Sequence, residues 1–141
     1  MNKKTGFTLL TTTALIALSL ILSACGPKEP VTVEVTLTEF GIESSVSEFK
    51  SGTPYHFVIT NEGAINHEFM IMEPTAEGMM MSMEEMDEMA LAFVEEDELT
   101  PGASQTLDYT FTEPASAGSL EIACHTSGHY EAGMKFPITV E

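Results

Sequence analysis

The residues best suited to chemistry lie in one short stretch near the end of the chain. Cys124, His129 and Met134 are each separated by four residues, and a glycine directly precedes each of the last two. A thiolate and two imidazoles in a trigonal plane, with a weak thioether on the axis, form a type 1 copper site. The second imidazole must come from elsewhere, and we expect His67 to supply it. The pattern therefore predicts one mononuclear copper at these four residues.

The alternation of apolar and polar residues predicts the elements that position these ligands. Most of the chain after residue 30 alternates with a period of two, which is typical of strands with one buried face. The predicted strands cover residues 31–38, 55–59, 67–71, 107–112, 120–125 and 136–140, with a shorter edge strand within 43–50. Each proposed ligand lies an even number of residues from core residues of its own strand, as Cys124 does from Leu120 and Ile122. This shared parity places the ligand on the same face of the strand as those core residues. Short strands divided by turns favour an antiparallel sandwich or barrel.

Residues 75–98 break this alternation. They are rich in Met, Glu and Ala, and they predict a helix or a helical hairpin inserted between strands. Met83, Met86 and Met89 are spaced by three and would form a stripe on one helical face. Two interpretations stay open. The stripe is either a lid that packs flexible thioethers onto the copper end, or a second, soft site for Cu(I).

The beginning of the chain resembles the signal of a bacterial lipoprotein. Lys3 and Lys4 precede an apolar stretch over residues 7–22, and Leu-Ser-Ala-Cys follows, ending at Cys25. The resemblance implies that residues 1–24 are removed and that Cys25 carries a lipid. Residues 25–30 would then tether a domain of residues 31–141 to the membrane, facing the periplasm or the extracellular side. An ordinary secretory signal and an uncleaved anchor are the alternatives.

The number of cysteines bears on the role of Cys124. Cys25 and Cys124 are the two cysteines of the sequence. If Cys25 is acylated, the exported domain keeps one thiol and cannot form an intrachain disulfide. A spare buried Cys is one interpretation of Cys124, and metal ligation is the other.

The charge of the chain limits its partners. The formal net charge is −17, from 22 acidic residues against five basic ones. This balance argues against nucleic acid as a partner and against electrostatic attachment to anionic lipid. We expect a monomer whose redox protein partners present a basic docking patch.

The ligand pattern and the strands together resemble the cupredoxin family, with a ligand loop as long as those of its auracyanin and rusticyanin types. The resemblance covers residues 31–141 apart from the insertion. It implies a Greek-key β-sandwich with copper at one end. In that arrangement His67, Cys124 and His129 are the equatorial ligands and Met134 is the axial ligand. Plastocyanin and azurin have an Asn after the first His, where this chain has Glu68.

Three polar residues lie out of register with the core residues of their strands. They are Glu68, His125 and His56. Because alternate side chains of a strand point to opposite faces, we expect all three at the surface.

The resemblance implies a one-electron carrier that cycles between Cu(II) and Cu(I). The alternative is a copper-binding or copper-delivery protein that uses the methionine segment for Cu(I). We do not expect an enzyme, because four protein ligands would leave the copper no open position for a substrate. A carrier should retain its copper over many turnovers, whereas a delivery protein should release it.

Overall fold

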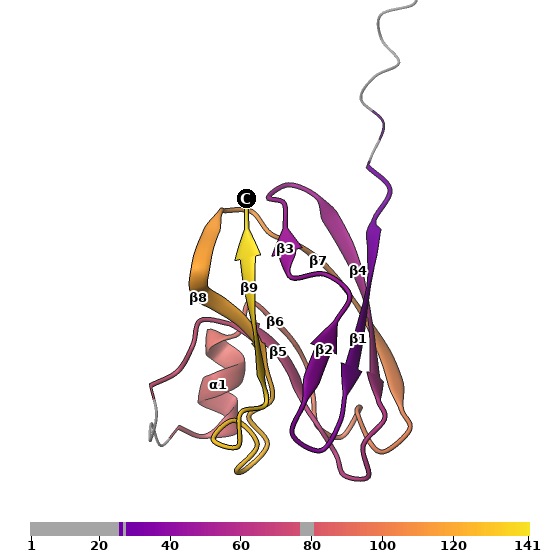
Figure 1. The fold of residues 1–141 in the computed structure, drawn as a ribbon, viewed down its shortest axis with the longest axis vertical. Helices are drawn as coiled ribbons and strands as arrows, with labels where there is room; N and C mark the ends of the chain where they lie inside the picture. Colours follow the sequence, from indigo (N-terminus) through magenta and orange to yellow (C-terminus); the bar gives the residue numbers. More distant parts are fainter. Residues whose placement is uncertain (1–25, 27, 77–80) are drawn as a thin grey trace, which may run out of the picture.

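The computed structural model describes residues 26, 28–76 and 81–141, and Figure 1 shows two β-sheets packed face to face. The predicted signal and Cys25 lie outside these residues. Within the described residues, one sheet has the strand order β2-β1-β4-β7 and the other the order β3-β9-β8-β5-β6. The predicted β-sandwich is therefore confirmed.

The strands follow the alternating segments of the sequence. The first sheet consists of β1 (Val31–Leu37), β2 (Ile42–Ser44), β4 (Pro54–Asn61) and β7 (Ser104–Thr110). The second consists of β3 (Glu48–Phe49), β5 (Phe69–Met72), β6 (Ala92–Val94), β8 (Ala115–Ala123) and β9 (Lys135–Val140). The expectation of antiparallel pairing needs one correction, because β1 pairs in parallel with β4, and β3 with β9. The reason is that the chain crosses to the second sheet at β3 before it returns as β4, in the direction of β1.

Alternate residues of the strands fill the space between the sheets. In β4 every second residue is buried, with Tyr55, Phe57 and Ile59 pointing inward. Phe49 packs against Tyr55 and Phe57, with ring centroids 4.9 and 5.8 Å away. Each such buried side chain contributes about 1.5–3 kcal/mol relative to an exposed one. This packing holds the two sheets together and carries the loops at their ends.

The segment of residues 75–98, of which residues 77–80 lie outside the described part of the chain, contains the predicted helix, but among its described residues this helix is short. The helix α1 covers only Met83–Met89, and residues 92–94 form β6, which pairs with β5. Ser82 starts α1 with a capping box, in which its side chain accepts from the Glu85 backbone and the Glu85 carboxylate accepts from the Ser82 backbone. The helix ends early because an aromatic and a β-branched residue follow in β6 and complete the sheet edge. No helix among the described residues is long and apolar enough to cross a membrane.

The strand β5 is buried on both of its faces. Phe69 and Ile71 belong to the core between the sheets. Met70 and Met72 point the other way and pack with Met86 of α1. The helix therefore covers the outer face of the second sheet, as its place beside β5 and β8 in Figure 1 indicates.

Candidate metal centre

Cys124 and the two ligand candidates that follow it are held by one tight loop between β8 and β9. This loop lies at the end of the sandwich away from the C-terminus (Figure 1). The Cys124 amide donates to the Met134 carbonyl at 3.1 Å, and the Met134 amide donates to the His129 carbonyl at 3.0 Å. Gly128 and Gly133 have φ values of +83° and +100°, which disfavour residues with a Cβ. The glycines before the two ligands therefore allow the loop to close.

His67 comes from a second loop, between β4 and β5, and Asn61 holds that loop in place. The Asn61 side chain is fully buried and donates to the carbonyls of Ile65 and Leu99 at 2.8 and 2.7 Å. Its oxygen accepts from the Gly63 amide at 2.8 Å. The His67 amide donates to the same Leu99 carbonyl at 3.2 Å. Asn61 therefore positions the loop that carries His67, a role that the sequence alone did not indicate.

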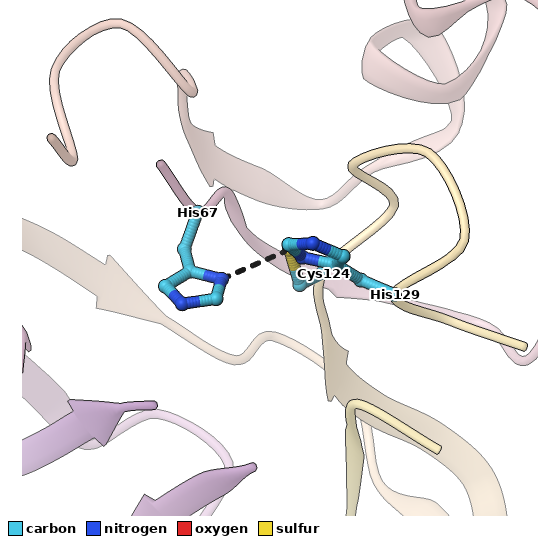
Figure 2. A group of neighbouring side chains, drawn as sticks. All are labelled: His67, Cys124 and His129. Carbon is cyan, nitrogen blue, oxygen red and sulfur yellow. Dashed lines mark hydrogen bonds between the residues drawn. The ribbon is translucent and has the colours of Figure 1, made fainter. Parts of the chain in front are cut away.

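The three strongest ligand candidates meet in the interior. Figure 2 shows His67, Cys124 and His129 side by side, and all three are buried. The Cys124 Sγ atom lies 4.0 Å from His67 Nδ1 and 3.4 Å from His129 Nδ1. The two imidazole centroids are 5.1 Å apart. Among the described residues, this is the one group of three or more His, Cys, Asp or Glu ligand atoms that lie within 4.8 Å of one another.

These distances fit a metal ion between the three atoms. With bonds of about 2.0 Å to nitrogen and 2.3 Å to sulfur, ligands in a trigonal plane lie about 3.7 Å apart. The observed separations of 3.4 and 4.0 Å fall on either side of this value. One thiol and two imidazoles also form the donor set that suits type 1 copper rather than calcium or magnesium.

Met134 is fully buried and belongs to the same core cluster as Cys124. The hydrogen bonds from its backbone place it at the base of the ligand loop, beside Cys124. Its position is therefore compatible with that of an axial ligand, and ligation by its thioether stays a prediction.

Burial sets the protonation of the metal-free site. It raises the pKa of the Cys124 thiol, although hydrogen bonds from Thr126 and the Glu68 amide oppose this. The Glu68 amide donates to Sγ at 3.3 Å, and the Thr126 hydroxyl lies 3.4 Å from Sγ, where it can donate to the thiolate. Burial, followed by the proximity of His129, lowers the pKa of His67. A neutral imidazole is the form that binds a metal, and the thiol has to lose its proton when the metal enters.

Two of the three residues expected at the surface are buried. Glu68 is 2% exposed, and burial, followed by repulsion from Asp87, raises its pKa to about 7. His125 is 8% exposed and stacks on Tyr130, with ring centroids 4.3 Å apart. Both point away from the core, as their parity predicts, but α1 and the ligand loop cover this outer face.

The third, His56, does reach the surface. Its side chain is 38% exposed and its Nδ1 lies 2.6 Å from the Asp108 carboxylate on β7. It lies in the first sheet, whose outer face no helix covers within the described residues. The residue takes no part in the metal centre.

The three methionines of α1 differ in their burial. Met86 is buried, whereas Met83 and Met89 are 39% and 48% exposed. Met86 packs with Met70 and Met72. Copper binding by Met83, Met86 and Met89 stays a prediction.

Comparisons with known proteins connect this centre to copper. No protein-family model matches the chain. It is 30% identical to the copper-resistant cuproprotein CopI of Pseudomonas aeruginosa over 139 residues, covering 77% of this chain and 75% of that protein. It is 31% identical to the copper-resistant cuproprotein CopI of Rubrivivax gelatinosus over 111 residues, covering 77% of this chain and 66% of that protein.

The fold is also shared with solved structures of auracyanins. Auracyanin of Roseiflexus castenholzii superposes with a TM-score of 0.58 at 20% identity, covering 81% of this chain and 98% of that one. Auracyanin B superposes with a TM-score of 0.60 at 18% identity, covering 84% and 95%. Auracyanin A of Chloroflexus aurantiacus, described as a blue copper protein, has a TM-score of 0.55 at 16% identity, covering 80% and 100%.

Proposed function

The chain belongs to the cupredoxin family and, within it, to the CopI cuproproteins. From this membership and from the site, we propose that the protein is a blue-copper electron-transfer protein with a single type 1 site. His67, Cys124 and His129 would hold the copper, with Met134 as a further, weaker ligand. Bound copper supplies a one-electron couple between Cu(II) and Cu(I). The chain's own task is to keep the ligands in the same place in both oxidation states.

The observation that carries this proposal is the preformed ligand set. In the chain itself Sγ lies within 4.0 Å of both Nδ1 atoms, and one ligand atom from each of the three residues lies within 4.8 Å of the others; two loops with their own hydrogen bonds hold them. A site whose supporting residues already fix the ligands needs little rearrangement when its charge changes. Such a site suits repeated electron transfer.

A short path for the electron between the copper site and the protein surface supports the same proposal. His129 is 6% exposed, and the ring of Phe40 meets it edge-on with centroids 5.6 Å apart. Phe40 is itself 56% exposed. An electron could therefore pass between His129 and a docked protein. Because the chain is strongly acidic, we expect that docked protein to present a basic surface. We propose no enzymatic turnover, because four protein ligands would leave no position for a substrate.

A second candidate function is copper handling, and the CopI relatives favour it. They are named for copper resistance, and they match three quarters of this chain. In this case the protein would bind copper outside the cytoplasm and pass it on or keep it away from other targets. Anchoring through Cys25 would suit both functions, and it stays part of the proposal.

Retention of copper separates the two functions. Copper-loaded protein is reduced and reoxidised through many cycles in the presence of a Cu(I) chelator. We expect the blue absorption to return with nearly full amplitude after each cycle, because the ligands are buried. Progressive transfer of copper to the chelator would contradict the electron-transfer proposal and favour copper handling.

A further inference from the structure

The residues that directly follow the three proposed ligands of the loop between β8 and β9 gather outside the metal centre. These ligands are five positions apart, and so are the residues after them: His125, Tyr130 and Lys135. The imidazole of His125 stacks on the ring of Tyr130, with centroids 4.3 Å apart and planes inclined by 16°. The Lys135 ammonium lies over the same ring, with Nζ 4.4 Å from its centroid. The tyrosine ring therefore connects the backbone next to all three ligands.

The hydroxyl of Tyr130 attaches this ring to β8. It donates to the Glu121 carboxylate at 2.6 Å, and Glu121 is 4% exposed. Glu121 and His125 lie an even number of residues apart, so both side chains point to the outer face of the second sheet. The Nε2 atom of His125 has no hydrogen-bond partner in the described part of the chain, so contact with the tyrosine ring, rather than a bond at this atom, holds the imidazole. Tyr130 is therefore held at two points along this face.

Tyr130 is also the one buried residue inside the loop that is not a proposed ligand. From Thr126 to Gly133, all of which the structure describes, His129 and Tyr130 are buried and the other residues are half-buried or exposed. Two of the exposed residues are glycines with positive φ values. Because glycine restricts the backbone less than any other residue, the loop needs an attachment to keep one conformation. The tyrosine side chain supplies it.

We propose that Tyr130 is a positioning residue of the copper site, and that the stack of His125, Tyr130 and Lys135 holds the ligands of the loop in place from outside. The three ligands would then keep their positions when copper is reduced, reoxidised or removed. Residues outside the ligand set commonly orient the ligands of a metal in this way. The inference rests on the proposed blue-copper function and adds to it a residue that does not itself bind copper.

The experiment compares three variants of the full protein with wild type. Tyr130→Leu removes the ring, whereas Tyr130→Phe keeps the ring and removes only the hydroxyl. Tyr55→Leu is the matched control, because Tyr55 is 5% exposed against 7% for Tyr130 and belongs to the core between the sheets. The Tyr55 hydroxyl also takes part in one hydrogen bond, which it accepts from the Lys50 amide at 2.7 Å. Urea unfolding of each variant measures its general loss of stability.

The copper-loaded proteins show whether the ring positions the ligands. We expect Tyr130→Leu to shift the visible absorption band and the reduction potential, and to release copper to excess EDTA roughly tenfold faster than wild type. Tyr130→Phe should release copper more slowly than Tyr130→Leu, because its ring can still stack on His125. Tyr55→Leu should keep the wild-type spectrum, potential and release rate. Wild-type copper properties in Tyr130→Leu, equal effects of Tyr130→Leu and Tyr130→Phe, or the same effects in Tyr55→Leu would each overturn the proposal.

A further variant covers the case in which Tyr130→Leu does not fold. Lys135 is exposed, so Lys135→Met should fold, and it removes the ammonium from the Tyr130 ring. We expect this variant to release copper faster than wild type. An unchanged release rate would contradict the role of the stack.

Hydrogen exchange of the metal-free proteins tests the same inference without copper. The amides of Cys124 and Met134 close the loop by donating to the carbonyls of Met134 and His129. Tyr130→Leu should speed the exchange of these two amides by roughly tenfold relative to the rest of the second sheet, whereas Tyr55→Leu should not. Unchanged relative exchange in Tyr130→Leu would overturn the proposal. A wild type that binds Cu(II) without blue absorption would refute the proposed function instead, and the exchange rates would still decide on Tyr130.

Discussion

Replacing Glu68 tests whether the outer face of the second sheet is buried, because the carboxyl group of this residue lies away from water beside the metal centre. The residue is 2% exposed, and burial is the main reason that its pKa rises from the ordinary 4.5 to about 7. The change Glu68→Gln keeps the shape and removes the charge. We expect this change to stabilise the metal-free protein at alkaline pH.

The sign and size follow from proton linkage. The folded protein holds the Glu68 proton up to about pH 7, whereas the unfolded chain loses it near 4.5. Stability from this group is therefore fully present below pH 4.5 and is lost as the pH rises through 7. At 1.36 kcal/mol for each pKa unit, the loss in the free energy of unfolding is about 3 kcal/mol.

The assay is urea unfolding of metal-free wild type and Glu68→Gln at a series of pH values from about 4 to 8.5. The difference between the two unfolding free energies should grow by about 3 kcal/mol over this range, in favour of the variant. Glu43→Gln on β2 is the control, since Glu43 is exposed and its replacement should leave the pH curve unchanged. Parallel curves for wild type and Glu68→Gln would refute the reasoning.

Three further outcomes are expected. Gly63→Ala should weaken copper binding by roughly tenfold and alter the visible spectrum, because a Cβ at this position would lie 2.9 Å from His67 Nε2; an unchanged spectrum would contradict the tight approach. Met134→Leu should keep the colour and change the reduction potential, since the axial ligand tunes the site rather than creating it; an unchanged potential would argue against axial ligation. Cys25→Ser should release the protein from membranes or leave its signal unprocessed, and a mature-sized, acylated protein in the membrane fraction would reject the lipoprotein hypothesis.

The sequence predicted the inner side of the fold well. Strand parity depends only on alternation, so Cys124 and His67 could be assigned to the same interior as their apolar neighbours without knowledge of the sheets. The spacing of Cys124, His129 and Met134 also predicted that these residues lie close together. The structure places all three on one short loop whose hydrogen bonds are local.

The outer side could not be predicted in the same way. Parity indicates that Glu68 and His125 point away from the core, but it does not indicate whether another element covers them. Here α1 and the ligand loop do so, and both residues are buried. The extent of α1 was overestimated because good helix formers continue past the point where pairing with β5 takes over. The role of Asn61 depends on a contact with Leu99, 38 residues away, which no local pattern reveals.

The most direct test of the central claim is the visible absorption spectrum of the copper-loaded protein, recorded with its copper content. The site of His67, Cys124, His129 and Met134 predicts one tightly bound Cu(II) and the intense charge-transfer band of a copper–thiolate bond. The Cys124→Ser variant, which replaces the thiol by a hydroxyl of similar shape, should lose the band. A colourless wild type that holds stoichiometric Cu(II), or a Cys124→Ser variant that stays blue, would contradict the account.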